Sequence, residues 1–109
     1  MVKWYTTVCY FGTNIKNINI VSNNEWFFFV NKYIKPCFNS FTISNNIGYW
    51  NGVKELTYTL TIIHKNDPIV MDKLINISKK YSMIYKQDEI IINTTKSINL
   101  IELSKLIKS

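Results

Sequence analysis

The chain has 109 residues, of which 47% are hydrophobic and 15% aromatic, and its formal net charge is +6 at pH 7. This composition excludes a disordered chain, and the length predicts a single domain spanning residues 1–109. All 13 basic residues are Lys, which argues against sequence-specific nucleic-acid recognition, because Arg is the usual reader of base edges. The surplus of positive charge still favours small partners that carry phosphate.

The expected location is the cytoplasm. No apolar run reaches the roughly 18 residues that a membrane span needs, so no membrane partner is expected. The first residues lead directly into a strand pattern rather than a secretory signal. Cys9 and Cys37 follow no disulfide pattern, which indicates two free thiols in a reducing compartment.

The first half of the chain predicts one strand and one helix. Residues 2–11 are rich in β-branched and aromatic side chains and predict a strand, and residues 12–21 predict a polar loop. Ser22 and Glu25 have the spacing of a capping box, so a helix is expected to begin here. It should end before Pro36, because proline disfavours the helical conformation of the preceding residue. Its buried stripe is expected to comprise Trp26, Phe29, Val30, Tyr33 and Ile34.

The dipeptide Asn51-Gly52 predicts a β-hairpin formed by residues 41–50 and 54–65, because a two-residue type I′ turn needs positive φ at both positions. The register that follows places apolar side chains on one face and polar side chains on the other. The apolar pairs are Ile47–Leu56, Ile43–Leu60 and Phe41–Ile62, and the polar pairs are Thr42–Thr61, Ser44–Thr59, Asn46–Thr57 and Gly48–Glu55. Glu55 is therefore expected to stand opposite a glycine, with open space above it.

A second helix is predicted to begin at Asp67 and Pro68, with Asp as the cap and Pro at the first helical position. Its buried face is expected to comprise Val70, Leu74, Ile77, Tyr81 and Ile84. Residues 89–93 predict a short fourth strand. The tail, residues 97–107, fits either an edge strand followed by a helical turn or an amphipathic helix.

The resulting order is β-α-β-β-α-β. Right-handed crossovers then give a ferredoxin-like α+β sandwich, with an antiparallel sheet and both helices on one face. The chain leaves the other face of the sheet uncovered, and Tyr and Trp residues lie near it. Together these features predict a homo-oligomer.

The chain offers few groups for catalysis. One His and two Cys do not form a closed zinc site, the three Gly form no phosphate-binding loop, and no Ser-His-Asp arrangement is present, so no metal or cofactor is expected. Glu55 remains, with two interpretations. It is either an exposed strand carboxylate that pairs with a Lys, or part of a site where aromatic rings and an acid bind a weakly hydrated cation such as a sulfonium.

Short motifs in the chain resemble a bacterial domain family of unknown function over residues 8–93, in matching order and spacing. These motifs are Tyr10-Phe11-Gly12, residues 26–38 with their Ile-x-Pro-x-Phe pattern, Phe41-Thr42, Gly48-Tyr49-Trp50, the Glu55 strand and residues 85–89. This resemblance supports the layout and implies no activity.

The chain also resembles the phage S-adenosylmethionine (SAM) lyases and the related SAM-AMP lyases of type III CRISPR signalling and phage defence. The resemblance rests on the strand order, on a hairpin that carries Asn51-Gly52 and Glu55, and on the pattern of residues 94–102. It implies a trimer with active sites between subunits. It also implies cleavage of the sulfonium substrate to 5′-methylthioadenosine, or its AMP adduct, and homoserine lactone, by attack of the substrate's own carboxylate on its γ-carbon.

The second resemblance also implies a site. Glu55 is the candidate that orients the sulfonium and amino end, and Tyr58 matches a tyrosine of those lyases, although the register places Tyr58 on the helix-facing side. The candidates for substrate binding are Tyr10, Tyr49, Trp50, Thr57 and Gln87. The positive net charge favours SAM-AMP over SAM. The alternatives are a non-catalytic module that binds or sequesters an adenine nucleotide, and a structural domain whose lysines contact nucleic acid.

Overall fold

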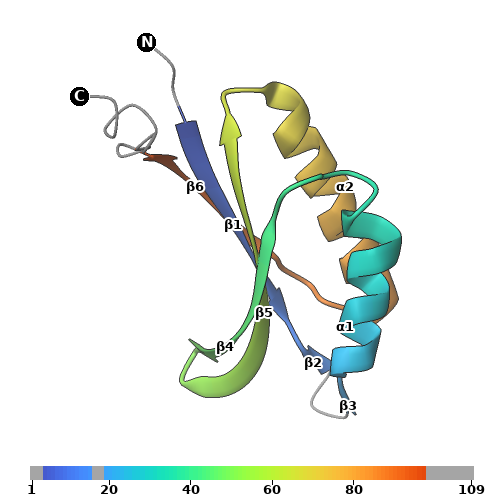
Figure 1. Cartoon of the computed structure of the whole chain (residues 1–109). Coiled ribbons are helices and arrows are strands. Elements are labelled where there is room, and N and C mark those ends of the chain that lie inside the picture. Colours follow the sequence, from blue (N-terminus) through green and yellow to red (C-terminus); the bar gives the residue numbers. More distant parts are fainter. Residues whose placement is uncertain (1–3, 16–18, 98–109) are drawn as a thin grey trace, which may run out of the picture.

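The computed structural model describes residues 4–15 and 19–97. Four strands form one antiparallel sheet in the order β4-β5-β1-β6, and both helical segments pack on the same face of it (Figure 1). The strands are β1 (Trp4–Gly12), β4 (Thr42–Trp50), β5 (Val53–Lys65) and β6 (Ile91–Ser97). The helices are α1 (Asn23–Phe29), which continues as the π-helix η1 (Val30–Ile34), and α2 (Pro68–Tyr85). This arrangement confirms the ferredoxin-like α+β prediction.

The β4–β5 hairpin has the predicted turn and register. Asn51 and Gly52 have φ values of 51° and 77°, as a type I′ turn requires. Trp50 pairs with Val53, and Gly48 pairs with Glu55. A local rule at two residues therefore determines which side of the sheet each side chain of the hairpin occupies.

Both helices begin where the sequence predicts. The Ser22 hydroxyl accepts a hydrogen bond from the Glu25 amide at 3.2 Å, and the Glu25 carboxylate accepts one from the Ser22 amide at 3.1 Å. The Asp67 side chain accepts a hydrogen bond from the Ile69 amide, with Pro68 at the first helical position. Each cap satisfies amides that have no partner within the helix.

The core lies between the sheet and the helices and is largely aromatic. Trp26 stacks on Tyr58 with a centroid distance of 4.8 Å, and Phe11 contacts Tyr81 at 4.8 Å. All four side chains are at most 1% exposed. Truncating a ring of this kind to Ala costs about 3–5 kcal/mol, so the aromatic stripe is a structural element of the fold.

The structure corrects three details. The loop predicted over residues 12–21 contains a small hairpin of β2 (Asn14–Ile15) and β3 (Asn19–Ile20). Ile84 is 46% exposed, and Tyr85 takes its place in the core because it lies a full turn after Tyr81. The last strand begins at Ile91 rather than at residue 89 and continues to Ser97.

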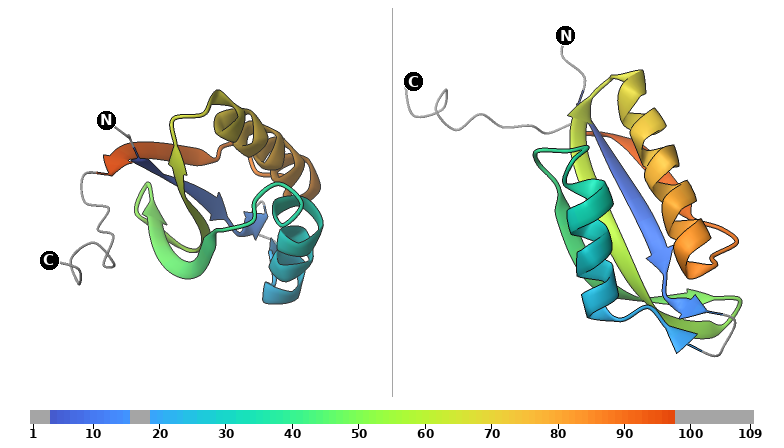
Figure 2. Two further views of the ribbon diagram at one scale, coloured as in Figure 1. Left: turned by 45° about the horizontal axis from the view of Figure 1, so that its top comes forward. Right: turned by 90° about the vertical axis from the view of Figure 1, so that its right-hand side faces the viewer.

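The face of the sheet opposite the helices carries no helix in the described part of the chain (Figure 2). Thr57 and Thr59 on this face are nevertheless buried. The Trp50 indole and the Thr57 hydroxyl both lie against Gly48, and the Thr59 hydroxyl bonds to side chains of β4. No helix among the described residues is long and apolar enough to span a membrane. The predicted alternatives for residues 98–107 lie outside the described residues.

Candidate functional site

A pocket of about 330 Å³ lies where the ends of β1 and β5 meet the segment that follows α2. Its lining combines aromatic, acidic and amide side chains from segments far apart in the sequence. The lining residues are Tyr10, Gly12, Trp50, Glu55, Gln87, Asp88, Glu89 and Ile91. A cavity that brings acidic and amide groups from separate segments together beside two aromatic rings is a candidate small-molecule site.

Glu55 is held in this pocket by the backbone. It is half-buried on β5, and its Oε2 accepts a hydrogen bond from the Asn14 amide at 2.7 Å. Asn14 begins β2, directly after the end of β1, so the bond ties the small hairpin to the main sheet. No described residue donates a hydrogen bond to the other oxygen, Oε1. One carboxylate oxygen is therefore structural, and the other is available to a ligand.

Gln87 reaches the same segment from α2. The helix ends at Lys86, which adopts a left-handed conformation with φ 55° and redirects the chain. The Gln87 Nε2 then donates to the Asn14 carbonyl at 2.7 Å. Asn14 is thus held at its amide by Glu55 and at its carbonyl by Gln87.

Gly12 is where these groups converge. A Cβ atom at this position would lie 2.9 Å from both Glu55 Oε1 and Gln87 Oε1, closer than real Cβ contacts allow. From the core side, the Tyr81 hydroxyl donates to the Gly12 carbonyl at 2.6 Å, and burial raises the pKa of Tyr81. The motif Tyr10-Phe11-Gly12 therefore has a physical reason, since a Cβ at Gly12 would displace the ends of the two side chains that hold Asn14.

Four of the seven side chains proposed from the sequence line this pocket: Tyr10, Trp50, Glu55 and Gln87. The other three do not. Tyr49 points to the opposite side of the hairpin and is 67% exposed. Thr57 is 2% exposed, with its hydroxyl beneath Gly48.

Tyr58 belongs to the core. It is fully buried, and its hydroxyl donates to the Val21 carbonyl at 2.9 Å. Burial raises its pKa, with a further contribution from Glu25. Its position on the helix-facing side agrees with the predicted register and gives it a packing role rather than a place in the pocket.

The open space expected above Gly48 is not present. A Cβ at Gly48 would lie 2.7 Å from the Trp50 Nε1 and 2.8 Å from the Thr57 Oγ1. The indole of Trp50 fills this space, and Glu55 turns toward Gly12 instead. Pairing on the hairpin alone does not determine this, because Gly12 belongs to another strand.

Sequence reasoning missed Gly12, Asp88, Glu89 and Ile91. The available signal was the acidic pair Asp88-Glu89 beside the candidate Gln87, but this pair was interpreted as the beginning of a strand. Together with Glu55, these residues give the lining three carboxylates and no Lys. The three acids do not converge tightly enough to form a metal site within the described residues.

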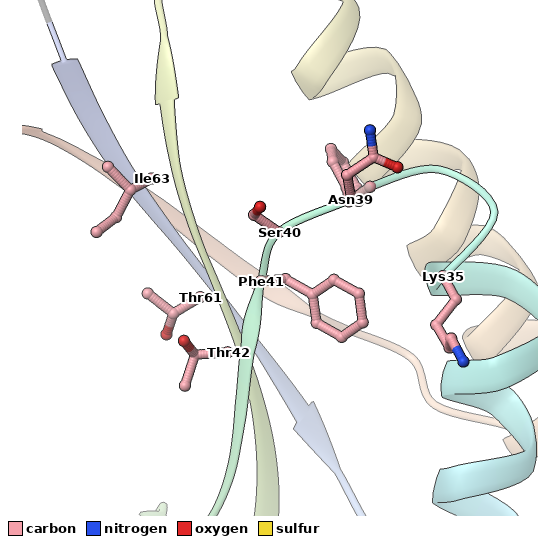
Figure 3. Close-up of a pocket in the computed structure, with 8 residues that line it drawn as sticks. Lys35, Asn39, Ser40, Phe41, Thr42, Thr61 and Ile63 are labelled. Atoms are coloured by element: carbon pink, nitrogen blue, oxygen red, sulfur yellow. The ribbon is translucent and has the colours of Figure 1, made fainter.

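A larger, open cleft of about 710 Å³ surrounds the start of β4 (Figure 3). It contains Lys35 and several hydroxyl groups but no acid. The Lys35 ammonium and the hydroxyls of Thr42 and Thr61 lie on opposite sides of the Phe41 ring (Figure 3). Because its polar groups do not converge on one point, we place the candidate site in the smaller pocket that contains Glu55.

A family model described as "Protein of unknown function (DUF3574)" matches residues 6–99. No curated protein matches the sequence. Among solved structures, a phage SAM lyase in its apo state aligns with a TM-score of 0.68 and 14% identity, over 86% of this chain and 81% of that one. A phage SAM lyase in complex with S-methyl-5′-thioadenosine aligns with a TM-score of 0.60 and 12% identity, over 85% and 81%.

A de novo designed protein, Foldit4, also aligns, with a TM-score of 0.55 and 14% identity, over 88% of this chain and 99% of that one. At such identities the likeness concerns the fold alone. A fold shared with a designed protein carries no activity by itself, so a functional argument must come from the pocket.

Proposed function

The chain belongs to the DUF3574 family, whose function is unknown, and we propose that it is a lyase that cleaves SAM or SAM-AMP. The products are 5′-methylthioadenosine, or its AMP adduct, and homoserine lactone. One observation carries the proposal: an acid, two aromatic rings and an amide meet in one pocket of a fold that is also found in phage SAM lyases.

The reaction needs little from the protein. The substrate's carboxylate oxygen attacks its own γ-carbon, a new C–O bond closes the lactone ring, and the C–S bond breaks. The sulfur keeps the electron pair of that bond and becomes a neutral thioether. No proton is transferred in this step, so no general base is needed, and the protein contributes mainly by holding the folded conformation of the methionyl arm.

Each pocket group has a role in this scheme. Trp50, which is 38% exposed, and Tyr10 offer aromatic faces that attract a sulfonium. The unbonded Oε1 of Glu55 orients the positive end of the substrate. Gln87 holds Asn14 through its amide nitrogen, and its Oε1 is a second acceptor for the substrate. The pocket is open on one side, and we propose that a second copy of the chain, in a homotrimer, closes it.

The alternative is a non-catalytic module that binds or sequesters an adenine nucleotide. The hydrogen bond from the Asn14 amide to Glu55 supports a non-catalytic protein, because it gives this acid a structural role that needs no reaction. In that case ligand is retained and recovered unchanged after long incubation.

The test is to incubate the purified protein with SAM or SAM-AMP and to measure 5′-methylthioadenosine or its AMP adduct by mass spectrometry. Glu55→Gln is the key variant, since the amide can still accept the bond from Asn14 while losing its charge. Asp72→Asn, an exposed acid on α2 outside the pocket, is the matched control. We expect product from the native protein and from the control, and a loss of about 100-fold or more in Glu55→Gln, because the substrate's positive end is no longer held in the attack geometry. Full activity in Glu55→Gln, with the same solution mass, would remove Glu55 from the mechanism.

A further inference from the structure

We infer that the Glu55 pocket selects a ligand whose bound end is positively charged and disfavours one that carries a phosphate, with Asp88 and Glu89 as specificity-determining residues. This inference rests on the proposed function and concerns its substrate. The inferred preference is for SAM, whereas the positive net charge of the chain led us to expect a preference for SAM-AMP.

The first argument is the local charge of the pocket. The chain has 13 Lys and 7 acidic residues, yet the pocket lining contains three of those acids and no Lys. No ion pair joins Glu55, Asp88 or Glu89 to a Lys within the described residues. The lining of the pocket is thus negative although the chain as a whole is positive; Lys54 and Lys86, which precede Glu55 and Gln87 in the sequence, do not line it. A ligand responds to the charges within a Debye length, about 8–10 Å at physiological ionic strength, rather than to the total charge.

The second argument is the pair of acceptor oxygens above Gly12. Glu55 Oε1 and Gln87 Oε1 both lie 2.9 Å from the point where a Cβ would stand. Neither oxygen receives a hydrogen bond from a described residue, since Gln87 uses its nitrogen and Glu55 uses its Oε2. Two neighbouring acceptors without a donor suit a ligand that brings N–H groups or a positive charge. A phosphate is an acceptor itself and offers them neither.

The third argument is the origin of the acids. Glu55 lies on β5, whereas Asp88 and Glu89 follow α2, so two separate segments place negative charge around one cavity. The side chains of Asp88 and Glu89 are exposed, and solvent screens them. We therefore expect each to change affinity by only about 5-fold, the effect of one charge a few ångströms away in water.

The test compares kcat/KM for SAM and SAM-AMP in the native protein, in Asp88→Asn and in Glu89→Gln. Asp72→Asn serves as the control with the same change in net charge. We expect the native protein to prefer SAM by about 10-fold or more, and each pocket variant to reduce that preference by about 5-fold. Added salt should reduce it as well, because screening weakens an electrostatic penalty but not a steric one. The control should keep the native preference.

SAM-AMP is also larger than SAM, so a second experiment compares two ligands of similar size, of which only one carries a phosphate. By titration calorimetry, 5′-methylthioadenosine should bind more tightly than adenosine 5′-monophosphate, and Glu89→Gln should narrow the difference. If neither SAM nor SAM-AMP is cleaved, the proposed function fails. If both are cleaved with equal kcat/KM, or if the preference is insensitive to salt and to both variants, the lyase stands and the selectivity inference is overturned.

Discussion

Replacing Gly12 with Ala perturbs the pocket at a single point. The added Cβ would lie 2.9 Å from Glu55 Oε1, 2.9 Å from Gln87 Oε1 and 3.0 Å from Glu55 Oε2. Gly12 lies within a strand and has no positive φ, so the backbone tolerates Ala and the effect is purely steric. The two side chains must withdraw, and the hydrogen bond between the Asn14 amide and Glu55 is lengthened or lost.

The expected cost follows from these contacts. Because the atoms that must move are the ends of two flexible side chains, the cost is that of their weakened hydrogen bonds to Asn14, about 0.5–1.5 kcal/mol each. The entropic advantage of Ala over Gly in a strand offsets about 0.5–1 kcal/mol of it. We expect a net loss of about 1 kcal/mol in the free energy of unfolding, which corresponds to a fall of roughly 0.5 M in the urea midpoint. Displacing Glu55 by even 1 Å is expected to lower the rate of lactone formation by about 100-fold.

Gly52→Ala is the matched control. Gly52 has φ 77°, and no atom lies within 4 Å of the position that a Cβ would take, so Ala there introduces backbone strain without a contact. This strain costs roughly 1–2 kcal/mol. Both variants should thus lose similar stability by urea titration, while only Gly12→Ala loses product formation or ligand binding. Native activity in a stably folded Gly12→Ala protein would refute the assignment of the pocket.

Two further predictions concern the core. Tyr58→Phe removes the hydroxyl that donates to Val21, so the free energy of unfolding in urea should fall by about 1–2 kcal/mol while kcat/KM is retained. A large loss of activity without a loss of stability would show instead that Tyr58 belongs to the active site. The free energy of unfolding should also fall at alkaline pH. Burial raises the pKa of Cys9 to about 12 and raises the pKa values of Tyr58, Tyr81 and Tyr85. Their contribution to stability is therefore complete below about pH 9 and decreases at higher pH, where these groups ionise in the unfolded chain before they ionise in the folded one. Urea titrations between pH 8 and 11 check this sign, and a constant midpoint would contradict it.

The hairpin and the helix starts were predictable because they depend on neighbours in the sequence. Asn51-Gly52 sets a turn, and the turn fixes every pair along β4 and β5. The capping box needs only Ser22 and Glu25. Ile84 was assigned to the wrong face because local spacing alone does not decide between the third and the fourth residue after Tyr81. Packing against the rest of the fold buries Tyr85, the fourth.

The pocket was only half predictable because it depends on distant pairs. Glu55 meets Asn14 across 41 residues, and Gln87 meets Asn14 across 73. Periodicity does not reveal that a glycine at the end of β1 makes room for both. Trp50 shows the limit of register most clearly, since the register of the hairpin was predicted but the position of the Trp50 ring over Gly48 was not.

A designed protein shares this fold, so the βαββαβ frame alone does not require Gly12, Glu55 or Gln87. A purely structural latch would need only the two contacts to Asn14. The observed arrangement instead leaves one unbonded acceptor oxygen on each of two side chains, above a residue that has no Cβ. Both oxygens are open to solvent rather than buried, so a ligand that enters the pocket can bond to them beside the aromatic rings, and this is the physical reason to expect one there.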